Sequence, residues 1–258
     1  MLAFAPVMWP EVISGMTQRD LMLVSAAGFF EAVYFSGLAG GYRAGDLSLV
    51  YPLARAVPAV SVTIGSTLLG RGDDISSWVW AGSGLIVAGT IVLPQCRFSD
   101  LRLSNYTSGA FLLAMLAAVG TTGYSLVDDQ ALRFLRSDHP EIHPAGVTLV
   151  YSFCQVIATA FWLGLLVLSR PAGRISFRIS LSQWRHILPT GAFIALTYAV
   201  VLLALAFARD VSYVVAFRQA SIPMGVAIGV LLFREPMPVP KFVGTAALLC
   251  GLVMIALA

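Results

Sequence analysis

Charged residues are scarce in this chain of 258 residues. They account for 11% of the sequence, whereas hydrophobic residues account for 58% and the mean hydropathy is +0.84. Soluble domains carry roughly 25% charged residues, because a soluble fold must cover its surface with groups that water solvates. The composition therefore excludes an ordinary soluble fold and indicates a chain that lies mostly in a lipid bilayer.

Residues that bind metals or perform covalent catalysis are also few. The three cysteines have no CxxC spacing, and the three histidines include no HExxH motif. No nucleophile is accompanied by a base at a usable spacing, and no phosphate-binding P-loop is present. We therefore expect that the chain is not an enzyme and that it has no metal site and no bound cofactor. We also expect that it does not use ATP directly. The net charge of +3 is small and the arginines are scattered, which disfavours nucleic acid as a partner.

Long apolar runs are the dominant feature of the chain. A helix needs about 20 apolar residues to cross the bilayer. Runs of this length are separated by short connections that hold most of the charge, and Trp78, Trp80 and Trp184 lie at their ends, where indole rings favour the membrane interface. The eight predicted membrane-spanning helices are 21–42, 47–69, 77–95, 107–128, 145–169, 187–208, 211–233 and 239–258.

The sequence also contains an internal repeat. A shift of 164 residues superimposes the first three predicted spans on the last three, and a gap of two residues keeps the glycines of the closing helices in register. The aligned identities are Tyr34 with Tyr198, Asp46 with Asp210, Ser48 with Ser212, Val50 with Val214, Ala56 with Ala220, Gly65 with Gly229, Gly82 with Gly244 and Gly89 with Gly251. We therefore predict a first repeat over 1–95 and a second repeat over 107–258.

The two repeats differ in length. Two helices, 107–128 and 145–169, precede the three-helix block of the second repeat, and the first repeat has no counterpart for them. Residues 1–8 align with 165–172, so the chain begins at the end of a second helix, and we favour an incomplete start over a genuine eight-helix variant. A five-helix unit crosses the membrane an odd number of times, so its second copy is inverted, as in secondary transporters. The expected fold is an all-α membrane protein, an inverted-repeat bundle of three plus five helices.

Short motifs in both repeats carry a family resemblance. They are Gly45–Arg55 (GDLSLVYPLAR) in the first repeat, and Val211–Gln219 (VSYVVAFRQ) followed by Phe233–Pro236 (FREP) in the second. Together with the glycine spacing of the closing helices, these motifs give a chain that resembles the drug/metabolite transporter superfamily, specifically its EamA-type ten-helix proteins without their first two helices. The resemblance implies a carrier for amino acids, metabolites or similar small polar solutes. One departure is Arg71, which stands where the second repeat has the acidic residue usual in the family, Glu235.

Three charged residues lie well inside the predicted spans: Glu31, Arg55 and Arg218. A charge at bilayer depth costs at least ~2.5 kcal/mol, so it normally faces a cavity or a partner. At ~1.5 Å per residue, Glu31 lies ~15 Å, Arg55 ~12 Å and Arg218 ~10 Å into its span. Because Arg218 enters a core of ~30 Å from the face opposite to Arg55, Glu31 falls between the two arginines in depth.

These depths predict a substrate site. We expect Arg55 and Arg218 to bind an anionic or carboxylate-bearing solute through their planar forks, while Glu31 neutralises one arginine in the empty site. The alternative is that the three charges pair with each other or with helix carbonyls and only fasten the halves of the bundle.

Neutral polar side chains extend this candidate site. Tyr34 and Tyr198 are related by the repeat and lie at similar depth, so they either line the cavity or pack in the core. Asp128 and Asp129 lie at the end of a predicted span and are expected at the membrane interface rather than as proton carriers. The weaker candidates are Gln155, Gln219 and Tyr124.

The predicted function is therefore a secondary carrier for a small polar or anionic metabolite, such as an amino acid or organic acid, in the plasma membrane (a bacterial inner membrane). The alternative is an inactive or regulatory membrane protein derived from a transporter by N-terminal truncation. The expected partners are the solute and the lipid bilayer, and a homodimer is left open. The loops place five basic residues on one side and nine on the other, which favours the second side as cytoplasmic, whereas the resemblance implies the reverse.

Overall fold

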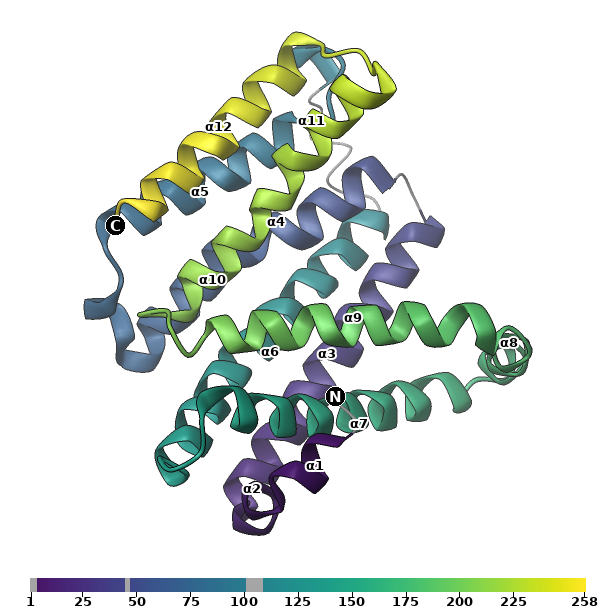
Figure 1. Cartoon of the computed structure of the whole chain (residues 1–258). Helices are drawn as coiled ribbons and strands as arrows, with labels where there is room; N and C mark the ends of the chain where they lie inside the picture. Colours follow the sequence, from purple (N-terminus) through teal and green to yellow (C-terminus); the bar gives the residue numbers. More distant parts are fainter. Residues whose placement is uncertain (1–3, 45–46, 101–108) are drawn as a thin grey trace. The chain divides into compact units, whose positions relative to one another are not determined.

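The computed structural model describes residues 4–44, 47–100 and 109–258, and within these ranges it is built from helices and their connections, without a strand. The α-helices are α1 (Ala5–Met8), α2 (Pro10–Gly15), α3 (Gln18–Ala44), α4 (Leu47–Ser66), α5 (Ser77–Val92), α6 (Gly109–Asp138), α7 (Pro144–Leu168), α8 (Pro171–Ser182), α9 (Trp184–Ala204), α10 (Val211–Phe217), α11 (Ser221–Phe233) and α12 (Val239–Ala256). The prediction of an all-α chain is therefore confirmed (Figure 1).

Six helical segments are long and apolar enough to cross a membrane. They are α3, α6, α7, α9, the continuous stretch Val211–Phe233 formed by α10 and α11, and α12. The apolar α5 has 16 residues, and α4 covers most of the second predicted span. The chain is thus a multi-pass membrane protein, and the count of eight spans stays a prediction.

Two connections differ from the sequence prediction. The helix expected to end at residue 128 continues to Asp138, because the residues after Asp128 keep pairing with the rest of the helix rather than turning into a loop. The loop 170–185 contains α8, which starts with Pro171 at its first turn and buries none of its residues. Proline favours the first turn of a helix, where its missing N–H has no partner to lose.

The described residues pack as two units. The first unit consists of residues 1–32 and 127–207, and therefore holds α1, α2, the start of α3, the end of α6, and α7 to α9. Its helices approach closely at glycines: a Cβ on Gly28 would lie 2.6 Å from the Ala158 Cβ, and one on Gly146 would lie 2.8 Å from the Trp9 ring. Small residues of this kind allow membrane helices to pack without a large apolar side chain between them.

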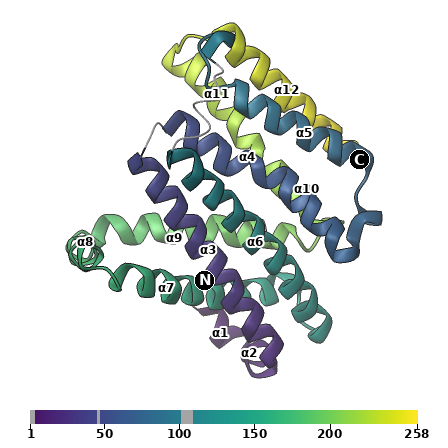
Figure 2. The same ribbon diagram turned by 180° about the vertical axis from the view of Figure 1, so that it is seen from behind.

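The second unit consists of residues 33–126 and 208–258. In it, α5 and α12 lie side by side along their lengths (Figures 1 and 2). Gly82 of α5 faces Gly251 of α12, and Gly89 faces Gly244, so the two helices run antiparallel. A Cβ on Gly89 would lie 2.5 Å from the carbonyl oxygen of Gly244, and a Cβ on Gly244 would lie 2.6 Å from that of Gly89. The backbones of α5 and α12 are therefore in direct contact at these glycines.

Two residues in the described part of the chain have a positive φ, and both lie where a helix ends. Gly70 has φ 83° in the turn that follows α4, and Arg234 has φ 53° directly after α11. A left-handed residue is a common way to end a helix, because it turns the next N–H back toward the last carbonyls. The Glu235 N–H accordingly donates to the Gly229 carbonyl at 3.1 Å.

Candidate functional site: two polar clusters

The first polar cluster surrounds a small cavity in the second unit. The cavity has a volume of about 20 Å³ and is lined by Tyr34, Ala54, Arg55, Thr121, Tyr124, Val215, Arg218 and Gln219. Four of the six predicted substrate-site residues are among them: Tyr34, Arg55, Arg218 and Gln219. The structure therefore brings these four together, and we call this set the arginine cavity.

A break in a helix positions two of these side chains. The α10 helix ends at Phe217, a 3-10 turn follows over Arg218–Ala220, and α11 begins at Ser221. Pro223 lies in the first turn of α11 and has no N–H to donate to the carbonyl four residues earlier, at Gln219. The regular α-helical ladder is therefore interrupted at Gln219. Irregular backbone of this kind inside a membrane segment is found where it is buried in protein or lines a cavity.

Hydrogen bonds join α4 to this break. The Gln219 amide donates from Nε2 to the Arg55 carbonyl at 2.8 Å and to the Val215 carbonyl at 3.3 Å. The Arg55 guanidinium donates to the Arg218 carbonyl at 3.5 Å, and the Arg218 guanidinium donates to the Tyr124 hydroxyl at 3.4 Å. Both arginine bonds lie at the long end of the usual range.

One polar atom at the cavity has no partner in the described part of the chain. It is Oε1 of Gln219, whose side chain is 3% exposed. A buried acceptor without a hydrogen bond costs about 1–3 kcal/mol, so a ligand that supplies a donor gains an interaction there. The arginine cavity thus offers cationic donors and one neutral acceptor, a combination that fits an anionic group next to an N–H or O–H group.

The cavity is too small for an organic solute in this conformation. A volume of about 20 Å³ admits one or two water molecules. Tyr34 and Tyr124 close part of it, with ring centroids 5.9 Å apart in an edge-to-face arrangement. A solute with several heavy atoms therefore needs the surrounding helices to move apart before it can bind.

The other two predicted site residues, Glu31 and Tyr198, belong to a second polar cluster in the first unit. The Thr159 hydroxyl donates to Glu31 Oε2 at 2.6 Å, and the Tyr198 hydroxyl donates to Asp128 Oδ2. Asp128 also accepts from the Tyr151 hydroxyl at 2.6 Å and from the Gln155 amide at 3.1 and 3.2 Å. We call this set the Asp128 network.

Asp128 is buried in protein, and its expected position at the membrane interface stays a prediction. Its residue is 0% exposed, and the helix continues for ten residues beyond it to Asp138. The next residue, Asp129, is also buried but accepts a hydrogen bond from Arg133 Nε at 3.0 Å, so it has a cationic partner on its own helix. The two adjacent aspartates therefore lie in different electrostatic surroundings.

Sequence reasoning missed three members of these clusters. Tyr151 and Thr159 bind Asp128 and Glu31, and Thr121 lines the arginine cavity. A signal was present for the first two, because Tyr151, Gln155 and Thr159 follow one another at intervals of four residues and so share one face of α7. A polar row of this kind stands out in an apolar span.

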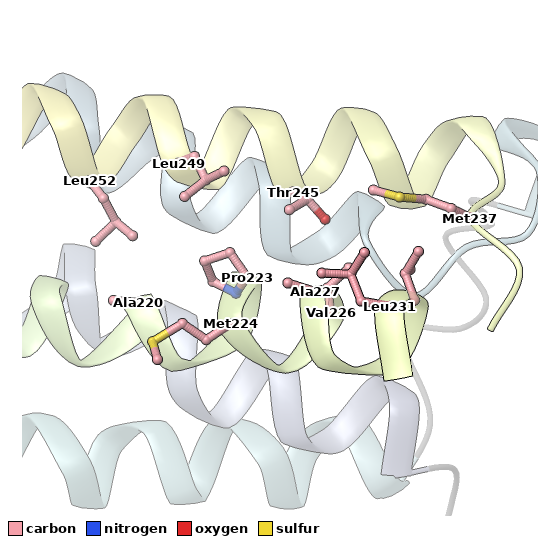
Figure 3. A pocket seen from close by; sticks show the side chains of 11 residues that line it. Ala220, Pro223, Met224, Val226, Ala227, Leu231, Met237, Thr245, Leu249 and Leu252 are labelled. Atoms are coloured by element: carbon pink, nitrogen blue, oxygen red, sulfur yellow. The ribbon is translucent and has the colours of Figure 1, made fainter. Parts of the chain in front are cut away.

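A larger cavity of about 520 Å³ lies between α11 and α12 in the second unit (Figure 3). It is lined by Ala220, Pro223, Met224, Val226, Ala227, Val230, Leu231, Met237, Thr245, Leu249 and Leu252. Nearly all of these side chains are apolar, and Met224 and Leu231 are largely exposed. Thr245 is the polar residue of this lining, and its hydroxyl donates to the Lys241 carbonyl at 2.7 Å. The arginine cavity is therefore the better candidate for a site that binds a charged solute.

The described residues contain no group of three His, Cys, Asp or Glu side chains that could hold a metal ion. Comparison of the chain with protein-family models, with curated proteins and with solved structures gives no match.

Proposed function

We propose that this protein is a secondary carrier for a small solute that bears a carboxylate or another anionic group, with the drug/metabolite transporter architecture that its motifs resemble. The observation that carries the proposal is the arginine cavity, in which Arg55, Arg218 and the open acceptor of Gln219 meet at a break in a membrane-spanning segment. An arginine fork binds a carboxylate with two parallel hydrogen bonds, which a lysine cannot do.

Backbone geometry supports the internal repeat on which this architecture depends. Gly70 and Arg234, the two positive-φ residues among those described, are 164 residues apart, which is the shift that aligns the repeats. Arg55 and Gln219 are also 164 residues apart, and the Gln219 side chain donates to the Arg55 carbonyl. Equivalent positions of the two repeats therefore meet at the arginine cavity.

The contacts between α5 and α12 support an inverted relation between the repeats. The repeat aligns Gly82 with Gly244 and Gly89 with Gly251. In the contact between Gly82 and Gly251, the repeat equivalent of Gly82 is Gly244 and that of Gly251 is Gly89. These two equivalents, Gly244 and Gly89, form the second glycine contact between the helices. A pair of antiparallel helices with this property has a local two-fold axis across it. Inverted repeats with a substrate site at their junction are typical of secondary transporters.

The proposal is tested by exchange across the membrane of proteoliposomes. We expect purified protein loaded with unlabelled anion to take up external labelled anion for at least one of glutamate, succinate and inorganic phosphate, and not to exchange glucose. Replacing Arg218 with Gln removes a charge-assisted hydrogen bond worth about 1.5–3 kcal/mol and should reduce exchange at limiting anion by roughly 10- to 100-fold.

The matched control is Arg178→Gln on α8. Arg178 is exposed and lies outside the arginine cavity, so this variant loses the same charge and should exchange anions at the wild-type rate. An Arg218→Gln protein that aggregates during purification would instead assign the arginine to fastening the helices. Wild-type vesicles that exchange none of the three anions would contradict the carrier itself.

A further inference from the structure

We infer that Asp128 is a proton-binding site buried between the helices, and that Glu31 and the hydroxyl groups around it tune its occupancy. The Asp128 network lies entirely in the first unit. Binding of the proton stands on the geometry of this network alone. Its use to drive the solute rests on the proposed function.

The first argument is the burial of Asp128 without a counter-charge. Its side chain is 0% exposed, and all of its hydrogen-bond partners in the described part of the chain are neutral: Tyr151, Gln155 and Tyr198. An ionised carboxylate that is buried without a counter-charge loses much of its hydration energy. The three donors offset part of this cost, because hydrogen bonds to a charged acceptor are the strong ones. Burial therefore favours the neutral acid, and the three hydrogen bonds favour the ionised one.

The basic side chains nearest in sequence are engaged elsewhere. Arg133 donates to Asp129, and Arg136 donates to the Thr148 hydroxyl at 2.9 Å and to the Leu202 carbonyl at 3.2 Å. The groups that face Asp128 are Tyr151, with Cys154 close to it, and Gln155 from α7, Tyr198 from α9 and Glu31 from α3. None of these groups carries a positive charge.

The second argument is the carboxyl group of Glu31. It lies close enough for its charge to act on both Asp128 and Tyr151. Thr159 binds Glu31 one helical turn after Gln155 binds Asp128, so the two carboxyl groups lie along one face of α7. Like charges repel strongly where the dielectric constant is low. A proton taken up by one of the two acids relieves this repulsion.

The third argument is the space available. Asp128 is completely covered and both of its oxygens receive hydrogen bonds, so a metal ion or an ammonium group would meet N–H and O–H hydrogens instead of open lone pairs. A proton needs no cavity. It can add to a carboxylate oxygen whenever one of the neighbouring hydroxyl groups turns from donor to acceptor.

This reversal gives the proton a mechanical effect. When Asp128 takes a proton from water, the new carboxylic acid donates one hydrogen bond, so either Tyr151 or Tyr198 stops donating and accepts instead. A charge-assisted hydrogen bond becomes a neutral one, which is about half as strong. Because Tyr198 is on α9 and Tyr151 is on α7, protonation loosens the attachment of one of these helices to Asp128 on α6.

The test is infrared spectroscopy of the purified full-length protein during a pH titration. We expect the carbonyl stretch of a protonated carboxylic acid at low pH, which fades in a single step as the pH rises and is lost in Asp128→Asn. The matched control is Asp129→Asn, the adjacent aspartate that is paired with Arg133, and this variant should keep the band.

Two further variants shift the titration in opposite directions. Glu31→Gln removes a neighbouring negative charge and should move the midpoint to lower pH by about one unit, a tenfold change in proton affinity. Tyr198→Phe removes a donor to the ionised acid and should move the midpoint to higher pH by about one unit. A carbonyl band that survives in Asp128→Asn would overturn the inference, and so would a titration midpoint that neither Glu31→Gln nor Tyr198→Phe moves. If Asp128→Asn fails to fold, the midpoint shifts of the other two variants still test whether Asp128 binds the proton.

Coupling to transport is measured separately in the proteoliposomes. With equal pH on both sides, we expect Asp128→Asn to exchange labelled anion, whereas a pH gradient should drive accumulation in the wild type and not in this variant. Wild-type vesicles that exchange anion but do not respond to a gradient would refute the coupling and leave the carrier intact. A failure of all exchange would refute the carrier, and the infrared titration would still decide whether Asp128 binds a proton.

Discussion

Replacing Gly89 with alanine should lower the stability of the detergent-solubilised protein by about 1–3 kcal/mol, the usual cost of overpacking a tight interface. The new Cβ would lie 2.5 Å from the Gly244 carbonyl oxygen and 2.9 Å from the Leu248 nitrogen. Both atoms belong to the backbone of α12, so no side chain can turn aside to make room. The helices must separate along the whole interface, and the temperature at which half of the protein stays monodisperse after heating should fall.

The matched control is Gly84→Ala, five residues earlier on α5. A Cβ on Gly84 meets nothing within 4 Å. Alanine also has a higher helix propensity than glycine, so this substitution should leave the stability unchanged or raise it slightly. Equal losses for the two variants would show that α5 and α12 do not pack through their glycines.

Asp210→Ala should lower the same stability by about 2 kcal/mol, since it removes a helix cap and leaves buried donors without an acceptor. Asp210 is 0% exposed and precedes α10. Its Oδ1 accepts from the Ser212 backbone N–H at 2.8 Å and from the Ser212 hydroxyl at 2.6 Å, and its Oδ2 accepts from the Ser66 hydroxyl. Arg71 lies 3.8 Å from the same carboxylate and loses an ionic partner.

Ser76→Ala provides the comparison for this prediction. Ser76 caps α5 with a single bond to the Trp78 N–H at 3.2 Å, in an exposed position. Water replaces that bond after the substitution, so the loss should stay at the low end for caps, about 0.5 kcal/mol. If both variants unfold at the same temperature, Asp210 acts only as a cap and its contacts with Ser66 and Arg71 add nothing. Thermal unfolding of both proteins in one detergent makes the comparison.

The apolar runs predicted most of the fold, because burial in a bilayer demands long apolar helices and little else. The apolar runs did not predict where α6 ends. The stretch after Asp128 contains charged residues, which by hydropathy mark a connection between spans. Asp129 binds Arg133 one turn further along the same helix, whereas Arg136 reaches Thr148 of α7 and the Leu202 carbonyl of α9. Partners that are distant in sequence cannot be read from hydropathy.

For the candidate site, too, the sequence predicts some features and not others. Depth along a helix follows from residue number, and it placed Arg55 and Arg218 on either side of the middle of the bilayer. The structure has both arginines, together with Tyr34 and Gln219, around one cavity. Depth does not give the direction in which a side chain points. The hydrogen bond from Thr159 to Glu31, for example, does not follow from the depth of either residue. Rotation about the helix axis depends on which helices are neighbours, and that information is absent from a single span.

The small volume of the arginine cavity has a consequence for measured affinities. If only a minor fraction of molecules is open enough to admit a solute, the apparent dissociation constant exceeds the intrinsic one by the inverse of that fraction, roughly a hundredfold for an open population of one in a hundred. Weak apparent binding by this protein would then reflect a scarce receptive state, not a poor fit. A substitution that opens the cavity without touching its arginines would therefore tighten binding, although it adds no contact to the solute.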